Sequence, residues 1–576
     1  MNFAKIIFLG LLFSSSLGFS QKKSFSAELN KKVYDSLKQD DSHVFKVEID
    51  SAYFVYGQVN QETVDVVVNV FDPDHISVQN FDGPARGPEA FTFVSKKKGE
   101  YEIVVTPFED NQGQYSFELK AVEPVATTAK AKVDQVMLPF SGDNVPGGVV
   151  MVMKDGDIIF EKAYGMSNLT YNIPFKTSTM TNLGSTSKQF TAMAIELLAQ
   201  RGKLNLDDDI RKYFPELPDF GKKVSIRNLL THTSGYREFL NLLAMTGRDL
   251  SGNLDREIIF QVLKNQPELQ NDPGAEWNYN NTGYVLLAAL VEKVTETPFP
   301  VWMQENIFEP LDMTNTMVRA NPNQVVPNRS MGYISSKKGE YEEVTDLGGA
   351  VGAGAIYSTV EDLAKWIRNF SKPKIGNKDI IREMATPYVL STGDTTNYGF
   401  GLQINEIRGL KNIHHGGADV AHRSMLMYFP EIEAGVVVES NNASFDQSIP
   451  EKVAIAFFRE YMKAEDKTEE AEAETKIFVY EPENFDAFTG KYELEEAPGF
   501  ILTFKRDGER IYTQATGQPE VDLKPVSDTV FSLVGVDAKI TFHSGPDGKP
   551  DTLTLHQHGD HLANRINWTP DEEELK

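Results

Sequence analysis

The stretch from Thr181 to Gly202, TNLGSTSKQFTAMAIELLAQRG, places a serine three residues before a lysine at the start of a predicted helix. The residues before Ser185 are polar and aperiodic, whereas apolar residues recur at helical spacing after Lys188 until Gly202 ends the run. Ser185 is therefore expected at the helix N-terminus, where backbone N–H groups lack intrahelical partners and negative charge is favoured. Lys188 falls on the same face. Against an apolar helix its pKa should be lowered, so that the neutral amine can accept the serine proton.

The spacing of this pair is a weak signal by itself, because serine precedes lysine by three residues elsewhere in the chain. The other pairs are Ser20/Lys23, Ser95/Lys98, Ser335/Lys338 and Ser371/Lys374. They lie in a predicted cleavage region or in turns and loops rich in lysine and glycine, and are read as solvated charges. The helical context therefore selects Ser185.

A second polar cluster contains Tyr279 and Asn281. It lies between a turn at Pro273-Gly274 and an apolar helix predicted over 285–294. Side chains at such a junction of loop and helix can point into a cleft. Alone, a tyrosine beside two asparagines is more often a capped surface turn. Downstream of a serine-lysine pair, the cluster predicts a phenol and an amide near the nucleophile.

A third cluster, His414-His415-Gly416-Gly417-Ala418, precedes a predicted buried strand over 424–429. Its glycines indicate an edge strand that offers backbone N–H groups to a ligand. Two adjacent histidines suggest a metal site. No third ligand follows at a familiar metal-binding spacing, so neither a metal nor another cofactor is predicted.

From about residue 143 to residue 460 the chain resembles the serine β-lactamase and penicillin-binding superfamily. The similarity is to its class C-like branch of β-lactamases, D-Ala-D-Ala carboxypeptidases, D-amino-acid peptidases and esterases. Beyond the three clusters, the matching stretches are residues 145–156, 204–208, 229–235, 352–363 and 398–402. The resemblance implies an α+β domain with a five-stranded antiparallel sheet, flanking helices and an all-helical lobe, and a site between lobe and sheet.

The resemblance also implies roles for four side chains. Ser185 would be the acylated nucleophile and Lys188 its proton acceptor. Tyr279 would relay a proton to the leaving group, and Asn281 would position substrate and lysine. The N–H groups of Ser185 and Ala418, with Gly417 beside them, would bind the oxyanion of the tetrahedral intermediate.

Two departures from the family pattern bear on the substrate. His415 stands where β-lactamases usually carry lysine, and a histidine with an ordinary pKa of about 6.5 is mostly neutral at pH 7. This favours an esterase or peptidase, and predicts that a substrate carboxylate binds more weakly as pH rises from about 6 to 8. Ala421-His422-Arg423 replaces a glycine and an aromatic residue at the cleft floor, where Arg423 could serve as another carboxylate anchor. His232 and Ser234 end a helix that begins near Ser225 and are read as structural.

Two β modules are expected to flank this domain, which is placed at 130–463. Residues 24–122 show period-two alternation at Phe45/Val47/Ile49 and in three further runs, with frequent turns. This predicts a β-sandwich similar to pre-peptidase or CUB-like modules. Its acidic turn at Asp72 and Asp74 could bind calcium, but a plain turn is the simpler interpretation. Residues 123–132 are interpreted as a linker.

The second boundary is a charge run over 464–478, interpreted as a solvated linker. Beyond it, short strands at regular spacing over 479–570 resemble the small lipocalin-like β-barrel that follows many relatives. His556, His558 and His561 suggest a metal site, but a hairpin accounts for them more simply.

Composition limits where the protein acts. Residues 1–20 have the pattern of a cleavable signal peptide, and no other stretch is long and apolar enough to cross a bilayer. The net charge of −26 argues against binding nucleic acid or anionic lipid, and the absence of cysteine excludes disulfides, thiol catalysis and a lipoprotein anchor.

The sequence therefore predicts an exported serine hydrolase, periplasmic or secreted, that acts on a small molecule or peptide. An ester, an amide, a D-amino-acid peptide and a β-lactam all fit the pattern. The alternative is a catalytically weak protein of the same fold that binds cell-wall peptide or a partner.

Overall fold

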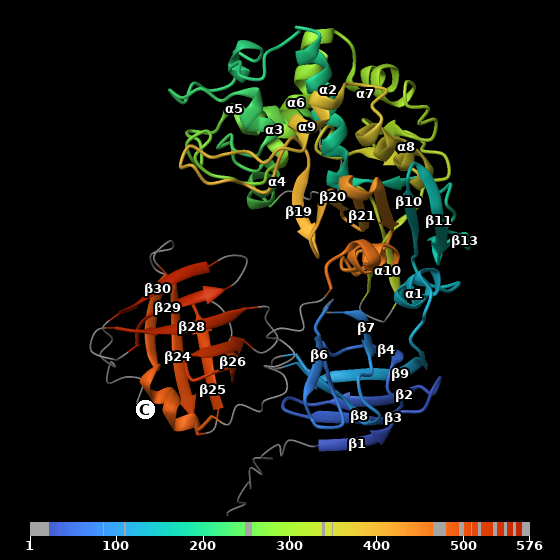
Figure 1. Cartoon of the computed structure of the whole chain (residues 1–576), viewed down its shortest axis with the longest axis vertical. Coiled ribbons are helices and arrows are strands. Elements are labelled where there is room, and N and C mark those ends of the chain that lie inside the picture. Colours follow the sequence, from blue (N-terminus) through green and yellow to red (C-terminus); the bar gives the residue numbers. More distant parts are fainter. Residues whose placement is uncertain are drawn as a thin grey trace, which may run out of the picture. The chain divides into compact units, whose positions relative to one another are not determined.

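The computed structural model describes residues 22–83, 86–108, 111–247, 256–336, 340–347, 349–464, 480–494, 500–508, 510–516, 520–533, 538–545, 550–556 and 560–566 (Figure 1). The chain divides into two compact units, Met1–Ala464 and Glu465–Lys576. The predicted signal peptide, the predicted charged linker after Ala464, and His558 lie outside the described residues. Among the described helices, none is long and apolar enough to cross a membrane.

The N-terminal part of the first unit is a sandwich of two sheets, with strand orders β1-β3-β8-β5-β6 and β2-β9-β4-β7. The residues predicted to alternate point into one apolar core, where Phe45 stacks on Phe117 with ring centroids 3.8 Å apart. The acidic turn carries its own counter-ion, because Lys97 bonds to both Asp72 and Asp74. The strands are β1 (Lys22–Ser26), β2 (Val33–Leu37), β3 (Ser42–Ile49), β4 (Tyr53–Gln61), β5 (Val66–Phe71), β6 (Ser77–Phe81), β7 (Gly87–Val94), β8 (Gly99–Pro107) and β9 (Gly113–Pro124).

The segment expected as a linker, 123–132, is mostly regular structure. Strand β9 continues to Pro124, and α1 (Ala129–Val136) begins after the Thr128 cap. The Gln135 side chain donates to the Glu123 carboxylate at 2.8 Å and to the Pro124 carbonyl at 2.9 Å. These bonds tie the helix to the last strand of the sandwich. The polar composition of this segment therefore reflects an exposed helix face as well as a connection.

The central domain is built on a six-stranded antiparallel sheet with the order β11-β10-β22-β21-β20-β19. Val149 and Met151 face the α2 and α8 side, and Val150 and Val152 face the α1 and α10 side. Because both faces of β10 are buried, its sequence is a continuous run of apolar residues. The six strands are β10 (Gly148–Lys154), β11 (Asp157–Tyr164), β19 (Gln403–Ile407), β20 (Leu410–Asp419), β21 (His422–Phe429) and β22 (Ala434–Ser440).

The expectation of five strands is wrong by one edge strand. β19 folds back on β20 through a tight turn at Arg408-Gly409, where both residues have positive φ. It pairs with the first half of β20, beginning with Gln403 opposite His414 and ending with Ile407 opposite Leu410. The second half of β20, from His415 onward, has no partner strand on that side among the described strands.

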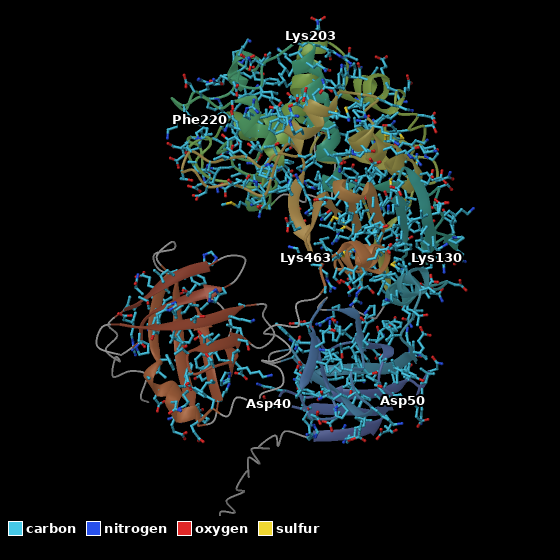
Figure 2. All side chains as sticks on the ribbon, in the orientation of Figure 1. Asp40, Asp50, Lys130, Lys203, Phe220 and Lys463 are labelled. Atoms are coloured by element: carbon cyan, nitrogen blue, oxygen red, sulfur yellow. The ribbon has the colours of Figure 1, made fainter. Side chains whose placement is uncertain are left out.

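A helical lobe covers one face of the sheet. Its central helix α2 packs against α6 and reaches the far end of the lobe near Lys203 (Figure 2). The helices are α2 (Lys188–Gln200), α3 (Ile226–Leu230), α4 (Phe239–Met245), α5 (Arg256–Lys264), α6 (Asn281–Thr295), α7 (Phe299–Met303), α8 (Val360–Ser371), α9 (Lys378–Met384) and, beneath the sheet, α10 (Ile449–Phe458).

Short elements connect these parts. Small strands are β12 (Met166–Asn168), β13 (Ile173–Pro174), β14 (Thr181–Asn182), β15 (Met317–Val318), β16 (Gly332–Ser335), β17 (Tyr341–Val344) and β18 (Ile356–Ser358). Short helical turns are η1 (Leu138–Phe140), η2 (Gly184–Ser187), η3 (Ile210–Lys212), η4 (Gln304–Phe308), η5 (Pro430–Ile432), η6 (Arg459–Tyr461) and, in the second unit, η7 (Pro482–Ala487). β14 pairs with β18 and leads directly into η2, which carries Ser185.

The second unit is a closed eight-stranded barrel, with β30 pairing back to β23. Aromatic side chains fill its interior around Phe542, and the His556 imidazole bonds to the Thr541 hydroxyl at 2.9 Å. The strands are β23 (Gly490–Leu494), β24 (Ile501–Asp507), β25 (Arg510–Ala515), β26 (Glu520–Pro525), β27 (Val530–Leu533), β28 (Lys539–Ser544), β29 (Pro550–His556) and β30 (Asp560–Ile566). The predicted fold class, with α+β centre, β-rich N-terminus and barrel, is confirmed.

A chain shortened to end at Ala464 should fold and hydrolyse small esters as fast as the full chain. The apolar cores of the central domain and the sandwich are complete without the second unit, whose core is separate. Thermal unfolding and kcat/KM for a small ester, measured on both chains, test this. A folded but inert short chain would mean that the barrel completes the active site.

Candidate active site

Ser185 lies in η2, a single 3₁₀ turn that continues into α2, as the sequence predicted. The preceding Gly184 has φ of +48°, and a Cβ placed there would lie 2.8 Å from the backbone of Ala418. Glycine is therefore required for the turn to touch β20. Ser185 is half-buried at this contact, with its hydroxyl facing the lobe.

Lys188 is completely buried, and its amine contacts three oxygen atoms. Nζ lies 2.9 Å from Ser185 Oγ, 2.8 Å from Asn281 Oδ1 and 2.9 Å from the Ala353 carbonyl oxygen. Burial lowers the pKa of this lysine to about 7, against the opposing attraction of the Glu238 carboxylate. A neutral amine has two N–H groups and one lone pair. It can therefore donate to Asn281 and Ala353 while its lone pair accepts the Ser185 proton.

Tyr279 and Asn281 come from the N-terminal end of α6, with Asn280 between them as the helix cap. The Tyr279 phenol hydrogen-bonds to the Ser185 hydroxyl, and burial raises its pKa well above the usual value. The phenol is therefore neutral at physiological pH and can pass a proton between Ser185 and a bound group. Lys188 Nζ lies 4.9 Å from the centre of the Tyr279 ring.

His415 is buried beside these groups, and both of its ring nitrogens have partners. Nδ1 lies 2.6 Å from the Gly416 carbonyl oxygen and Nε2 lies 2.8 Å from the Tyr398 hydroxyl. Because a carbonyl oxygen only accepts, Nδ1 carries the proton and Nε2 accepts from Tyr398. Burial, followed by the nearby Lys188 charge, lowers the pKa of His415 to about 3.

The expectation that His415 titrates between about pH 6 and 8 is therefore wrong. An exposed imidazole would keep its ordinary pKa, but this ring is desolvated and lies near a second cationic group. It carries no charge that could anchor a carboxylate. The interpretation of His415 as a substitute for a cationic lysine does not hold for this site.

Gly417 and Ala418 lie on the half of β20 that has no β19 partner. A Cβ on Gly417 would lie 2.0 Å from the Leu183 carbonyl oxygen, so only glycine lets the strand pack on the nucleophile turn. The Thr186 hydroxyl donates to the His415 carbonyl at 3.0 Å and reinforces the contact. Ala418 is exposed, and its backbone lies against Gly184, the residue before Ser185.

Two further residues hold this junction together. Asn182 Oδ1 accepts the Gly184 N–H at 2.9 Å, and Asn182 Nδ2 donates to the Asp419 carboxylate at 2.9 Å. One amide thereby connects the neighbours of Ser185 and Ala418. Sequence reasoning missed both residues, because they are 237 positions apart in the chain. We call Asn182 and Asp419 the turn-strand clamp.

His422 and Arg423, in the unusual Ala421-His422-Arg423 segment, both bond to other protein groups. His422 is buried, with its ring bonded to the Asp346 carboxylate at 2.7 Å and to the Ser330 hydroxyl at 3.0 Å. The Arg423 guanidinium donates to the carbonyl oxygens of Val420 and His422 at 3.1 and 2.9 Å.

His232, interpreted from sequence as structural, packs directly on the site. Its ring centre lies 4.3 Å from that of Tyr279, and its Nδ1 accepts the Asn280 N–H at 3.2 Å. Its backbone is left-handed, with φ of +58°. Burial holds its pKa well below the usual value, so the ring is neutral. It supports the Tyr279 loop through packing.

Comparison with known proteins agrees with this geometry. The Beta-lactamase family profile matches residues 130–456. Penicillin-binding protein 4* of Bacillus subtilis is 26% identical over 69% of this chain and 90% of its own length. A D-aminopeptidase of Gluconobacter oxydans is 25% identical over 62% of this chain and 66% of its own length. The octameric penicillin-binding protein homologue of Pyrococcus abyssi superposes with a TM-score of 0.54 and 25% identity, covering 76% of this chain and 99% of that one. The resemblance stated from the sequence is confirmed.

The rate of acylation should follow the protonation of Lys188. For a neutral ester, kcat/KM should rise with pH up to about 7 and then level off, because the neutral amine accepts the proton. The Asp419 carboxyl, whose pKa burial raises to about 6, is another titrating group nearby. In an Asp419→Asn variant the rise of kcat/KM near pH 7 should persist. If this rise of kcat/KM disappears in the Asp419→Asn variant, the titrating group is not Lys188.

Asn182→Ala should lower kcat by about 10- to 100-fold and change KM much less, because it releases the nucleophile turn η2 from strand β20. Asn369→Ala is a matched control, since Asn369 is equally buried and caps the loop at Lys374 and Ile375. Both variants should melt earlier, but only the first should lose kcat when measured below its unfolding transition. Equal losses of kcat would reduce Asn182 to a stabilising role.

Proposed function

The chain belongs to the Beta-lactamase family of serine hydrolases, and we propose that it hydrolyses an ester or an amide through an acyl-enzyme on Ser185. The observation that carries this proposal is the buried Lys188 amine, 2.9 Å from Ser185 Oγ and with a pKa lowered to about 7. A lysine desolvated in this way next to a hydroxyl is what an activated serine requires.

In the acylation step, Ser185 Oγ attacks the substrate carbonyl carbon and its proton moves to Lys188 Nζ. The carbonyl oxygen becomes an oxyanion, held by the N–H groups of Ser185 and Ala418. The bond to the leaving alcohol or amine then breaks. The leaving atom takes a proton through the Tyr279 hydroxyl, which Lys188 resupplies, so the amine is neutral again when the acyl-enzyme has formed.

In the deacylation step, a water molecule attacks the acyl carbon. Its proton passes to the Tyr279 and Lys188 pair, and the second tetrahedral intermediate uses the same two N–H groups. Ser185 leaves and regains its proton from Lys188, and a carboxylic acid is released. Asn281 keeps the lysine in place throughout by accepting one of its N–H groups.

The named relatives support an amide as one substrate class, since one is a D-aminopeptidase. A β-lactam or a D-Ala-terminated peptide is less well supported, because each carries a carboxylate and His415 is neutral. Export to the periplasm or the medium is part of the proposal and rests on the pattern of residues 1–20. The alternative, a binding protein without turnover, has no need of an activated serine.

Ser185→Ala and Lys188→Ala should each lower turnover of a p-nitrophenyl ester by about 10³-fold or more, and the double variant should be little worse. The two groups act as one unit, so their losses do not add. Steady-state rates and unfolding midpoints measured on all three variants check this.

Ser187→Ala serves as the matched control, because Ser187 lies in the same turn with its hydroxyl directed to the Ile356 N–H. It should keep both turnover and covalent labelling by a fluorophosphonate. In the wild type, mass spectrometry should place the adduct on the peptide that contains Ser185. An adduct elsewhere, or labelling that survives Ser185→Ala, would falsify the mechanism.

A further inference from the structure

A pocket of about 510 Å³ adjoins the site where β19 begins. Ligand pockets commonly have volumes of this order. Its lining residues come from the loop before α6, from the loop over 390–398, and from the start of β19 and the middle of β20, two strands that lie side by side in Figure 1. The residues that line it include Trp277, Leu390, Tyr398, Ile404 and His414.

Two residues that line the pocket pack near the catalytic Tyr279. The rings of Trp277 and Tyr398 lie 6.3 and 6.5 Å from the ring of Tyr279, between centres, and 5.9 Å from each other. In the proposed mechanism Tyr279 protonates the leaving atom. Trp277 and Tyr398, which line the pocket and pack near the Tyr279 ring, therefore connect this proton donor to the pocket.

The lining of the pocket is uncharged. It contains no lysine, arginine, aspartate or glutamate among the described residues, and its polar groups are amides, hydroxyls and His414. Burial lowers the pKa of His414 to about 4, so this ring is neutral at pH 7. Next to it, both ring nitrogens of His415 are already bonded within the protein. A carboxylate placed here would lose water without gaining a cation.

We propose that this pocket is a subsite for the leaving group and takes an uncharged aromatic or aliphatic group of the departing alcohol or amine. The assignment rests on the proposed function, because it uses Tyr279 as the proton donor to that group. It narrows the substrate to esters and amides whose leaving part is apolar and lacks a carboxylate beside the scissile bond. Trp277, which is 38% exposed, offers an aromatic face at the pocket wall.

Three acetate esters test the subsite at nearly constant leaving-group basicity. They are methyl acetate, benzyl acetate and 4-(acetoxymethyl)benzoate, which is benzyl acetate with an added carboxylate. All three form the same acetyl-enzyme, so differences in kcat/KM report on acylation alone. We expect benzyl acetate to exceed methyl acetate by about 10- to 100-fold, from burial of the ring. The kcat/KM of the carboxylate ester should be close to that of methyl acetate.

A paired substitution ties this preference to the pocket. Leu390→Trp should fill the pocket and lower kcat/KM for benzyl acetate about tenfold or more, with methyl acetate unchanged. Val389→Trp is the control, because the neighbouring Val389 lines a different pocket with Arg227 and Tyr388. It should leave both esters unchanged.

Three results would overturn the subsite assignment. They are equal kcat/KM for methyl and benzyl acetate, preference for the carboxylate ester, and equal effects of the two tryptophan variants on benzyl acetate. In each case hydrolysis that still depends on Ser185 leaves the proposed function standing. If the wild type hydrolyses none of the three esters, the subsite assignment fails, and fluorophosphonate labelling of Ser185 decides the proposed function separately.

Discussion

The burial of one amine, that of Lys188, is the constraint on which the site depends. Burying a charged ammonium in an apolar interior costs free energy. Burial therefore lowers the pKa of Lys188 to about 7, so that the amine is partly neutral at physiological pH. The three oxygen atoms around Nζ come from η2, from the N-terminal end of α6 and from the loop before β18. The nucleophile, the Asn281 amide and the lysine are therefore brought together by the same packing that makes the lysine a base.

Close backbone approach is the second requirement. Gly184 on the turn and Gly417 on β20 face each other's segments at distances that no side chain would allow. The turn-strand clamp also joins these two segments, because the Asn182 side chain accepts from the Gly184 N–H and donates to the Asp419 carboxylate. An oxyanion site made of two N–H groups from different elements needs such a device, because its donors must keep a fixed separation without a covalent connection.

The neutral state of His415 sets this site apart from one built to bind carboxylates. The ring takes its place in a packed set of aromatic side chains, with Tyr398, Tyr279, Trp277 and His232 in mutual contact. The same packing that removes its charge also forms a wall of the adjoining pocket. The same packing therefore keeps His415 uncharged and gives the pocket an aromatic wall. In the proposed subsite, both effects favour an uncharged leaving group over one that carries a carboxylate.

The sequence by itself determined the nucleophile turn, the flanking β modules and the order of the three polar clusters, because each of these depends on local periodicity, turn residues and short motifs. Ser185 ahead of α2 and the alternating strands of the sandwich belong to this group. The fold class of the central domain followed from the resemblance of its motifs to a known family. The lowered pKa of Lys188 was expected from its apolar helix. Only the tertiary structure decided the tautomer of His415, the Ala353 carbonyl contact and the pairing of Asn182 with Asp419. Each depends on burial or on atoms that are far apart in the chain, and desolvation by distant segments leaves no trace in local sequence.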